Sequence, residues 1–353
     1  AEQNGLEPAL MAPTGRAAKR LAISSGRDAD TIHKALEASV RETGRTYFER
    51  NEANPLEEDL IIVDEASMLD ISLFYHLLCA LKDGARLILV GDIDQLPPVG
   101  AGEPLKDLMS WGYVPIVRLK RIFRQEEGSG IVENAALIRK GEMCVPDEAG
   151  EFRIIYAADD EDAYRIVMDL CRELNYGNEE NKMLLQVLSP MYRGVCGVDH
   201  LNESLQEMIH GEKVPDGMKF FPGDKVMQTR NDYEKGIYNG DVGTVWTATP
   251  QKVFVRYFDK EVVYEGEERF DLRLAYAVTV HKSQGSEYET VIFILRPSQH
   301  NMLQRNLLYT GVTRARKNTI LVTAPDALRR ALAIQHTGNR YSLFLPFLNH
   351  EAL

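Results

Sequence analysis

Short apolar runs of strand length recur along the chain, and segments with helical spacing separate them. The first three runs are residues 8–12 (PALMA), 60–63 (LIIV) and 87–90 (LILV), with helical spacing at 30–40 and 71–82. The second set has runs at 152–156, 184–189, 290–295 and 318–323, and helical spacing near 161–175, 199–210 and 303–314. Strands that alternate with helices are typical of a parallel, doubly wound sheet, so the sequence predicts two α/β domains.

Residues 218–272 show a different pattern of apolar and polar residues. Their apolar and polar residues alternate around two turn signals, Pro-Gly-Asp at 222–224 and Asn-Gly-Asp at 239–241. Alternation between such turns is typical of antiparallel strands. The sequence therefore predicts a small antiparallel β-barrel inserted into the second α/β domain.

Composition excludes several classes of protein. At 353 residues, with 44% hydrophobic and 27% charged residues, the chain resembles an ordinary soluble protein of two or three domains. It has no run of membrane-spanning length and no signal-peptide pattern, which predicts a cytoplasmic protein with no membrane partner. Its cysteines and histidines form neither C-x-x-C nor H-E-x-x-H, so no zinc site is indicated.

The net charge of −12 argues against indiscriminate binding to polyanions. Local basic clusters nevertheless occur at residues 14–20 (TGRAAKR), 118–124 (RLKRIFR) and 314–317 (RARK). Any one of them would suit a solvated helix face. Together they are compatible with a track, meaning a local line of residues along the surface that binds nucleic acid.

The apolar run at 60–63 ends on two adjacent carboxylates, Asp64 and Glu65. In an open α/β sheet the carboxyl ends of the strands carry the chemistry. One interpretation is that Asp64 caps a helix beginning near Ala66. The other is that Asp64 holds Mg²⁺ on a nucleotide while Glu65 positions or deprotonates the attacking water. The residues alone leave both open, and the second interpretation needs a phosphate cradle elsewhere.

Two further strand ends carry polar groups. The third strand runs into residues 91–102 (GDIDQLPPVGAG), where Gln95 suits a side chain that reaches a γ-phosphate, although a plain loop is the alternative. The first strand is followed by a segment that opens a helix. Thr14, Gly15 and Arg16 would place N–H groups and a cation at that helix N-terminus, which suits a phosphate of nucleotide or nucleic acid.

These segments resemble the motifs of superfamily 1 helicases and stand in the order of motifs Ia to VI. The later motifs match 119–125 (LKRIFRQ), 187–198 (VLSPMYRGVCGV), 275–295 (AYAVTVHKSQGSEYETVIFIL) and 307–322 (LLYTGVTRARKNTILV). The chain is most similar to the RecD-like group, the exodeoxyribonuclease V alpha-subunit family. This resemblance implies an ATP- and Mg²⁺-dependent motor of recombination and repair. Such a motor moves 5′ to 3′ on single-stranded DNA, with ATP between two RecA-like domains, and can have nuclease or helicase partner subunits.

The resemblance also implies residue roles. Asp64 would hold Mg²⁺, Glu65 would activate water, and Gln95 would sense the γ-phosphate. Arg124 and Arg314 resemble arginine fingers, and Glu287 would contact the nucleotide sugar or couple to DNA. The residues that would contact DNA are Thr14, Gly15, Arg16, Arg193, Thr279, His281 and Lys282.

A domain division follows from the same resemblance. Residues 1–117 would form a RecA-like domain 1A, truncated at its N-terminus, with a pin-like hairpin at 41–58, where the family carries its small strand-splitting pin. Residues 118–217 and 273–353 would form the two parts of the RecA-like domain 2A. The SH3-like domain 2B would be the insertion at 218–272.

The phosphate-binding loop G-x-x-x-x-G-K-[ST] is missing, since the chain contains no Gly-Lys dipeptide. The chain starts at Ala1 and reaches motif Ia by residue 12. We therefore expect a C-terminal fragment of a longer helicase that hydrolyses little ATP alone. The alternatives are the helicase portion of a conjugative relaxase and a non-enzymatic DNA-binding fragment.

Overall fold

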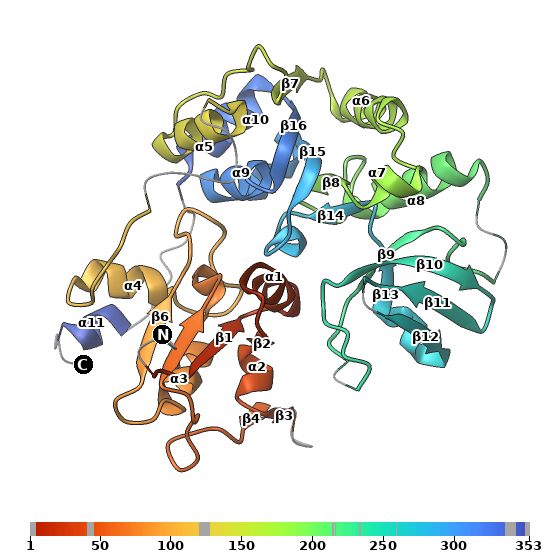
Figure 1. The fold of residues 1–353 in the computed structure, drawn as a ribbon. Helices are drawn as coiled ribbons and strands as arrows, with labels where there is room; N and C mark the ends of the chain where they lie inside the picture. The colour runs from red at the N-terminus through yellow and green to blue at the C-terminus, as the bar shows by residue number, and fades with distance from the viewer. Residues whose placement is uncertain are drawn as a thin grey trace. The chain divides into compact units, whose positions relative to one another are not determined.

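The computed structural model describes residues 5–40, 46–119, 128–213, 215, 217–232, 234–258, 260–335 and 344–349. The chain divides into two compact units (Figure 1). The first unit comprises residues 1–119 and 338–353, and the second comprises residues 120–337. Each unit is considered by itself below.

The first unit is built on a four-stranded parallel sheet with the strand order β2-β1-β5-β6. The strands are β1 (Pro8–Ala12), β2 (Asp30–Thr31), β5 (Leu60–Val63) and β6 (Arg86–Leu89). The helices are α1 (Gly15–Ser25), α2 (Ile32–Ala35), η2 (Ala66–Met68), α3 (Ile71–Cys79), α4 (Pro104–Trp111) and α11 (Phe344–Leu348). The strands predicted at 8–12 and 60–63 are confirmed, and the third begins one residue earlier than predicted.

The helical segment predicted at 30–40 is wrong. That stretch holds β2, the four-residue helix α2 and a further strand, β3 (Ala38–Val40). Thr31 starts the helix, because its side chain accepts a hydrogen bond from the Lys34 amide at 3.1 Å. Glu37 ends it by adopting a left-handed conformation with φ of 53°. The chain then turns into β3, which pairs antiparallel with β4 (Thr46–Phe48).

The core of the first unit lies where its strands and helices meet. The buried apolar side chains that pack together there are Met11, Ile32, Leu36, Phe48, Leu56, Ile61, Val63, Ala66, Leu69, Phe74, Leu77 and Ala80. Phe344 of α11 packs edge-on against Phe74, with ring centroids 5.9 Å apart. The C-terminal helix thus contributes to the first unit.

The second unit contains a five-stranded parallel sheet with the order β14-β8-β15-β16-β7. Its strands are β7 (Phe152–Tyr156), β8 (Leu185–Ser189), β14 (Ala277–Thr279), β15 (Tyr288–Leu295) and β16 (Ala315–Thr323). Its helices are α5 (Gly130–Lys140), α6 (Asp160–Glu173), α7 (Glu179–Lys182), α8 (Val198–His210), η4 (His281–Ser283), η5 (Pro297–Met302), α9 (Arg305–Val312) and α10 (Pro325–Ala333). Every residue of β8 is buried, as expected for a strand covered on both faces. The predicted second α/β domain is confirmed.

The segment predicted as an inserted barrel forms an antiparallel sheet of five strands with the order β12-β11-β10-β9-β13. The strands are β9 (Lys225–Gln228), β10 (Val242–Ala248), β11 (Lys252–Arg256), β12 (Glu261–Glu265) and β13 (Leu272–Leu274), with η3 (Gly266–Asp271) before the last. The antiparallel insertion is confirmed. Among the described residues the pairing is that of an open sheet, so closure into a barrel stays a prediction.

A buried polar network anchors this inserted sheet to the rest of the second unit. Asp224 is fully buried and accepts a hydrogen bond from the Tyr276 hydroxyl at 2.9 Å. Lys225 is also fully buried, and its Nζ donates to the carbonyl oxygens of Lys182 at 2.7 Å and Leu185 at 3.0 Å. Because a buried polar group that loses its partners is costly, these bonds fix the base of β9.

Candidate functional site

Asp64 and Glu65 occupy a tight turn at the carboxyl end of β5. The Asp64 amide donates to the Met11 carbonyl at 2.9 Å, and the Ala66 amide donates to the Val90 carbonyl at 2.8 Å. Between them Glu65 adopts a left-handed conformation, with φ of 52° and ψ of 36°, and donates its amide to Asp64 Oδ1 at 2.9 Å. Such a conformation costs a non-glycine residue on the order of 1–3 kcal/mol and is typical of functional sites.

The alternative role of Asp64 as a helix cap is not supported. The turn after Glu65 is the short 3₁₀ helix η2, and the next α-helix, α3, begins only at Ile71. Its cap is Asp70, whose Oδ1 accepts a hydrogen bond from the Leu73 amide at 2.8 Å. The carboxylate of Asp64 is therefore held by the turn and not used to start a helix.

The loop that carries Gln95 packs against this turn. Asp92 shapes the loop by accepting the Asp94 amide at 3.0 Å, and its carbonyl accepts the Gln95 amide at 3.2 Å. Gly91 lies so close that a Cβ atom there would come within 2.8 Å of the Ser67 amide nitrogen. The structure thus brings Gln95 and the Asp64–Glu65 turn into neighbouring positions of one unit.

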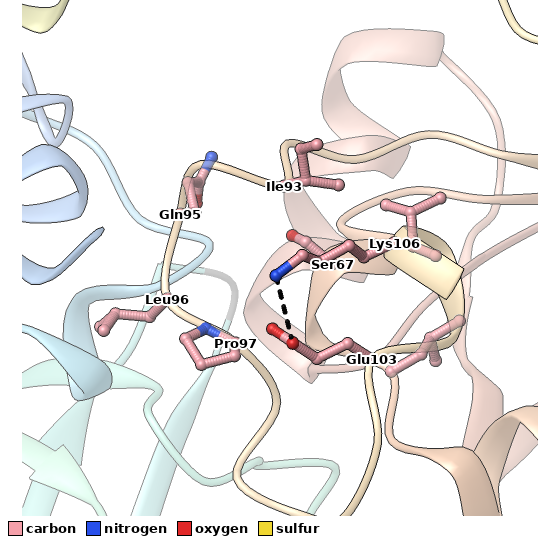
Figure 2. Close-up of a pocket in the computed structure, with 9 residues that line it drawn as sticks. Ser67, Ile93, Gln95, Leu96, Pro97, Glu103 and Lys106 are labelled. Atoms are coloured by element: carbon pink, nitrogen blue, oxygen red, sulfur yellow. Dashed lines mark ion pairs between the residues drawn. The ribbon is translucent and has the colours of Figure 1, made fainter. Parts of the chain in front are cut away.

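A small pocket separates the Gln95 loop from the η2 turn and α4. Figure 2 shows Gln95, Leu96 and Pro97 on one side of it and Ser67, Glu103 and Lys106 on the other. Lys106 and Glu103 form an ion pair at 3.6 Å. The remaining lining side chains are Leu69, Ile93 and Leu105. Since five of the nine lining residues are apolar and the one cation of the lining is paired with Glu103, this pocket does not have the donor set of a phosphate cradle.

Arg314 and Glu287 lie at the amino ends of β16 and β15, which are neighbouring strands of the second unit. Arg314 is only 2% exposed, and its guanidinium donates to the carbonyls of Thr310 at 3.1 Å and Ser286 at 3.2 Å. Glu287 accepts a hydrogen bond from Arg316 Nε at 2.8 Å. Sequence reasoning missed Arg316 as a site residue, although it stands two residues after Arg314 in the basic cluster at 314–317; unlike the buried Arg314, its side chain is 56% exposed.

The other predicted finger, Arg124, lies outside the described residues. Its placement relative to Arg314 therefore stays a prediction.

The residues predicted to contact DNA fall into two groups. In the first unit, Thr14 caps α1 by accepting the Ala17 amide at 3.3 Å, with Gly15 and Arg16 as the first helical residues. In the second unit, Arg193 follows β8, and His281 and Lys282 follow β14. Since β8 and β14 are parallel neighbours, these three residues follow strands that end at the same sheet edge.

The local contacts of the second group are polar. Thr279 Oγ1 accepts the Lys282 amide at 3.2 Å, and Lys282 Nζ donates to Asn239 Oδ1 of the inserted sheet at 2.7 Å. Burial lowers the pKa of Lys282, with a smaller contribution from the nearby Arg273. Burial also lowers the pKa of His281, which favours the uncharged form of this ring. The group therefore offers two cations, Lys282 and Arg193, together with a hydroxyl and an imidazole, rather than a dense basic patch.

The described residues contain neither a membrane-spanning helix nor a cluster of three or more His, Cys, Asp or Glu side chains that could hold a metal ion. Asp64 still fits Mg²⁺, because this ion is commonly bound in nucleotide sites by one or two carboxylates together with phosphates. The Glu65 amide holds Asp64 Oδ1 and thereby orients the carboxylate.

Comparison with known proteins agrees with this arrangement. Three family models match: an AAA domain at residues 1–153, the ATP-dependent RecD-like DNA helicase SH3 domain at 201–257, and the UvrD-like helicase C-terminal domain at 274–322. The solved Pif1 helicase from Bacteroides, in complex with ADP-AlF3 and ssDNA, has a TM-score of 0.57 at 20% identity, covering 98% of this chain and 87% of that chain. Pif1 from Candida albicans has a TM-score of 0.54 at 18% identity, with 98% and 89% covered. These likenesses show that the chain has a helicase fold.

Two curated relatives narrow the assignment. The ATP-dependent RecD2 DNA helicase of Deinococcus radiodurans is 38% identical over 347 residues, which cover 97% of this chain and 46% of that protein. The RecBCD enzyme subunit RecD of Mycolicibacterium smegmatis is 32% identical over 370 residues, which cover 95% of this chain and 66% of that protein. The chain belongs to the RecD-like helicase family. It spans about half the length of the first relative and about two thirds of the second.

Proposed function

We propose that this chain is the motor part of an ATP-dependent DNA helicase that moves 5′ to 3′ on single strands in recombination or repair. The observation that carries the proposal is the Asp64–Glu65 turn, held in a strained conformation beside the Gln95 loop. The names of the relatives, RecD2 DNA helicase and RecBCD subunit RecD, support it and suggest partner subunits. The proposal keeps the cytoplasmic localisation predicted from the sequence.

The proposed chemistry is phosphoryl transfer from ATP to water. Bound Mg²⁺, with Asp64 as its protein ligand, would neutralise charge on the phosphates. Glu65 would accept a proton from the attacking water, and Gln95 would donate its amide to the γ-phosphate. Arg314 and Arg124 would stabilise the negative charge that builds up on the transferring group. Glu287, held by Arg316, would contact the nucleotide sugar.

DNA and nucleotide would be linked through one short segment of the second unit. Thr279, at the carboxyl end of β14, begins the segment, and Glu287, just before β15, ends it. The proposed DNA contacts therefore lie at its start and the proposed nucleotide contact at its end. We propose that this segment couples DNA binding to nucleotide binding, as a translocating motor requires.

The domain division remains part of the proposal. We assign domain 1A to residues 1–117, with its hairpin at 41–58, and domain 2A to residues 118–217 and 273–353. Domain 2B is assigned to residues 218–272. The packing of α11 on Phe74 modifies this division, because it adds the C-terminal helix to the first domain.

Tailed DNA duplexes test the proposed activity directly. A longer protein that contains this chain together with a phosphate-binding loop should unwind a duplex with a 5′ single-stranded tail in an ATP-dependent reaction. It should leave duplexes with a 3′ tail or blunt ends intact, because a 5′-to-3′ motor needs a 5′ tail on which to load. Equal unwinding of both tailed duplexes would reject the polarity, and ATP-independent binding without unwinding would favour a non-enzymatic DNA-binding fragment.

Single-strand binding by this chain should depend only weakly on salt. A phosphate contact on single strands contributes a slope of roughly −0.7 to log K against log salt, so two to four contacts give a total of about −1.4 to −2.8. Lys282→Ala and Arg193→Ala should each make the slope shallower by about 0.7, measured by titrating labelled oligonucleotides at several salt concentrations. Arg165→Ala, in an exposed ion pair on α6, is the matched control. A steep slope with duplex preference, or wild-type behaviour of both variants, would contradict the proposed track.

A further inference from the structure

The β3–β4 hairpin is too small to hold its own shape. Its strands share only three residue pairs, from Ala38 opposite Phe48 to Val40 opposite Thr46. Isolated two-stranded hairpins are marginally stable in water at best. Its orientation on the first unit (Figure 1) must therefore come from contacts with other elements.

Phe48 makes these contacts. It is 8% exposed and belongs to the apolar core of the first unit. Its ring centroid lies 4.5 Å from that of His76 on α3 and 5.9 Å from that of His33 on α2. Tyr47, the preceding residue, projects from the opposite face of the strand and is 37% exposed. One residue of the pair is thus anchored in the core, and the other remains accessible.

The base of the hairpin is fastened as well. Arg50 donates its amide to the Leu36 carbonyl at 3.3 Å and its Nε to Glu37 Oε1 at 2.9 Å. These contacts hold the chain where it enters and leaves the hairpin. Within the two strands, Phe48 is the residue that enters the core, and Ala38 packs partly against it.

Helix α3 connects this anchor to the candidate nucleotide site. The Ile71 amide donates to the Ala101 carbonyl at 2.8 Å, in the loop that follows Gln95. A Cβ atom on Gly100 would come within 2.1 Å of Asp70 Oδ2, so this loop lies directly on the helix cap. His76 follows on the same short helix. Because α3 is one continuous helix from Ile71 to Cys79, its cap residue Asp70 and His76 belong to the same element.

We propose that Phe48 is a positioning residue that locks the hairpin to α3, so that the hairpin keeps a fixed orientation relative to the Asp64–Glu65 turn and the Gln95 loop. The consequence for DNA unwinding rests on the proposed function, with the hairpin at 41–58 as the pin that parts the duplex. The anchoring itself does not, and it can be measured without DNA or ATP.

Hydrogen exchange on this chain tests the anchor. Phe48→Leu keeps an apolar side chain but removes the ring contacts with both histidines. It should speed exchange of the Glu49 and Arg50 amides by about tenfold, while the Ile61 and Ile62 amides of β5 stay protected. Phe74→Leu, another buried ring of the same core, is the matched control and should not produce this local effect. If Phe48→Leu does not fold, His76→Leu replaces it in the test. This variant removes the ring contact between Phe48 and His76 by changing the less buried of the two residues.

DNA unwinding by the longer protein tests whether the anchoring of the hairpin by Phe48 matters for strand separation. Phe48→Leu should reduce the base pairs unwound per ATP severalfold, while DNA-stimulated ATP hydrolysis stays within about twofold of the wild type. Unchanged exchange at Glu49 and Arg50 would overturn the anchor. Faster exchange with an unchanged unwinding ratio, or equal loss in the Phe74→Leu control, would overturn the positioning role. A wild-type protein that never unwinds DNA would reject the proposed function and leave the exchange result to decide the anchor.

Discussion

Replacing Glu65 by Gln in the longer protein should lower DNA-stimulated ATP hydrolysis by roughly 10²–10⁴-fold, the usual contribution of a general base. Gln has the same size as Glu and can occupy the same left-handed turn, but its amide cannot take a proton from water. Nucleotide affinity should change little, because the amide nitrogen that orients Asp64 belongs to the backbone. Steady-state kinetics with saturating single-stranded DNA, together with a nucleotide-binding titration, give both quantities.

Glu58→Gln provides the matched control for this measurement. Glu58 precedes β5, whereas Glu65 follows it, so the two carboxylates lie at opposite ends of one strand. The control should keep wild-type turnover. If Glu65→Gln retained most of its activity, or if both variants lost it equally, the role of Glu65 as the base would be wrong.

The strand positions could be predicted from sequence because buried parallel strands read as short apolar runs. The runs at 60–63 and 152–156 match β5 and β7 residue for residue. The prediction of a helix at 30–40 failed. The apolar spacing of this segment suits a helix, but the cap at Thr31 and the left-handed conformation of Glu37 limit the helix to a few residues between them. A residue that adopts positive φ without being glycine carries no reliable signal in the sequence.

The polar anchor of the inserted sheet was not predictable for a different reason. Asp224 and Lys225 stand in a Pro-Gly-Asp-Lys turn that looks solvent-exposed, yet both are fully buried. Their partners include Tyr276 and Lys182, which are 52 and 43 residues away along the chain. Hydrophobic periodicity describes local spacing only and does not identify such distant partners.

The candidate site was predictable as a set of motifs but not as a set of contacts. Sequence order placed Asp64, Gln95 and Arg314 at the ends of their strands or helices. It did not indicate that Arg314 would be buried with backbone carbonyls as partners. Nor did it indicate that Arg316 would hold Glu287. Motifs specify residue types, whereas hydrogen-bond partners depend on how neighbouring strands are paired.

Shortening the β3–β4 hairpin should also have a large effect, in this case on DNA unwinding. In the longer protein, residues 41–45 would be replaced by the two-residue turn Asn-Gly and Tyr47 by Ala. Val40 and Thr46 are directly opposite each other, so a two-residue turn can join them, and Phe48 keeps its place in the core. Unwinding of a 5′-tailed duplex should then fall roughly tenfold or more, while single-strand-stimulated ATP hydrolysis persists.

The expected size follows from base stacking. Opening one base-pair step costs about 1.4 kcal/mol in lost DNA stacking. An aromatic side chain that stacks on the released base returns about 1–3 kcal/mol, so its loss raises the barrier by a similar amount. Phe258→Ala changes an aromatic residue that is 96% exposed between β11 and β12, and it controls for the loss of a surface ring. If unwinding and ATP hydrolysis fell together in the hairpin variant but not in this control, the hairpin would be a structural element and not a wedge that parts the strands.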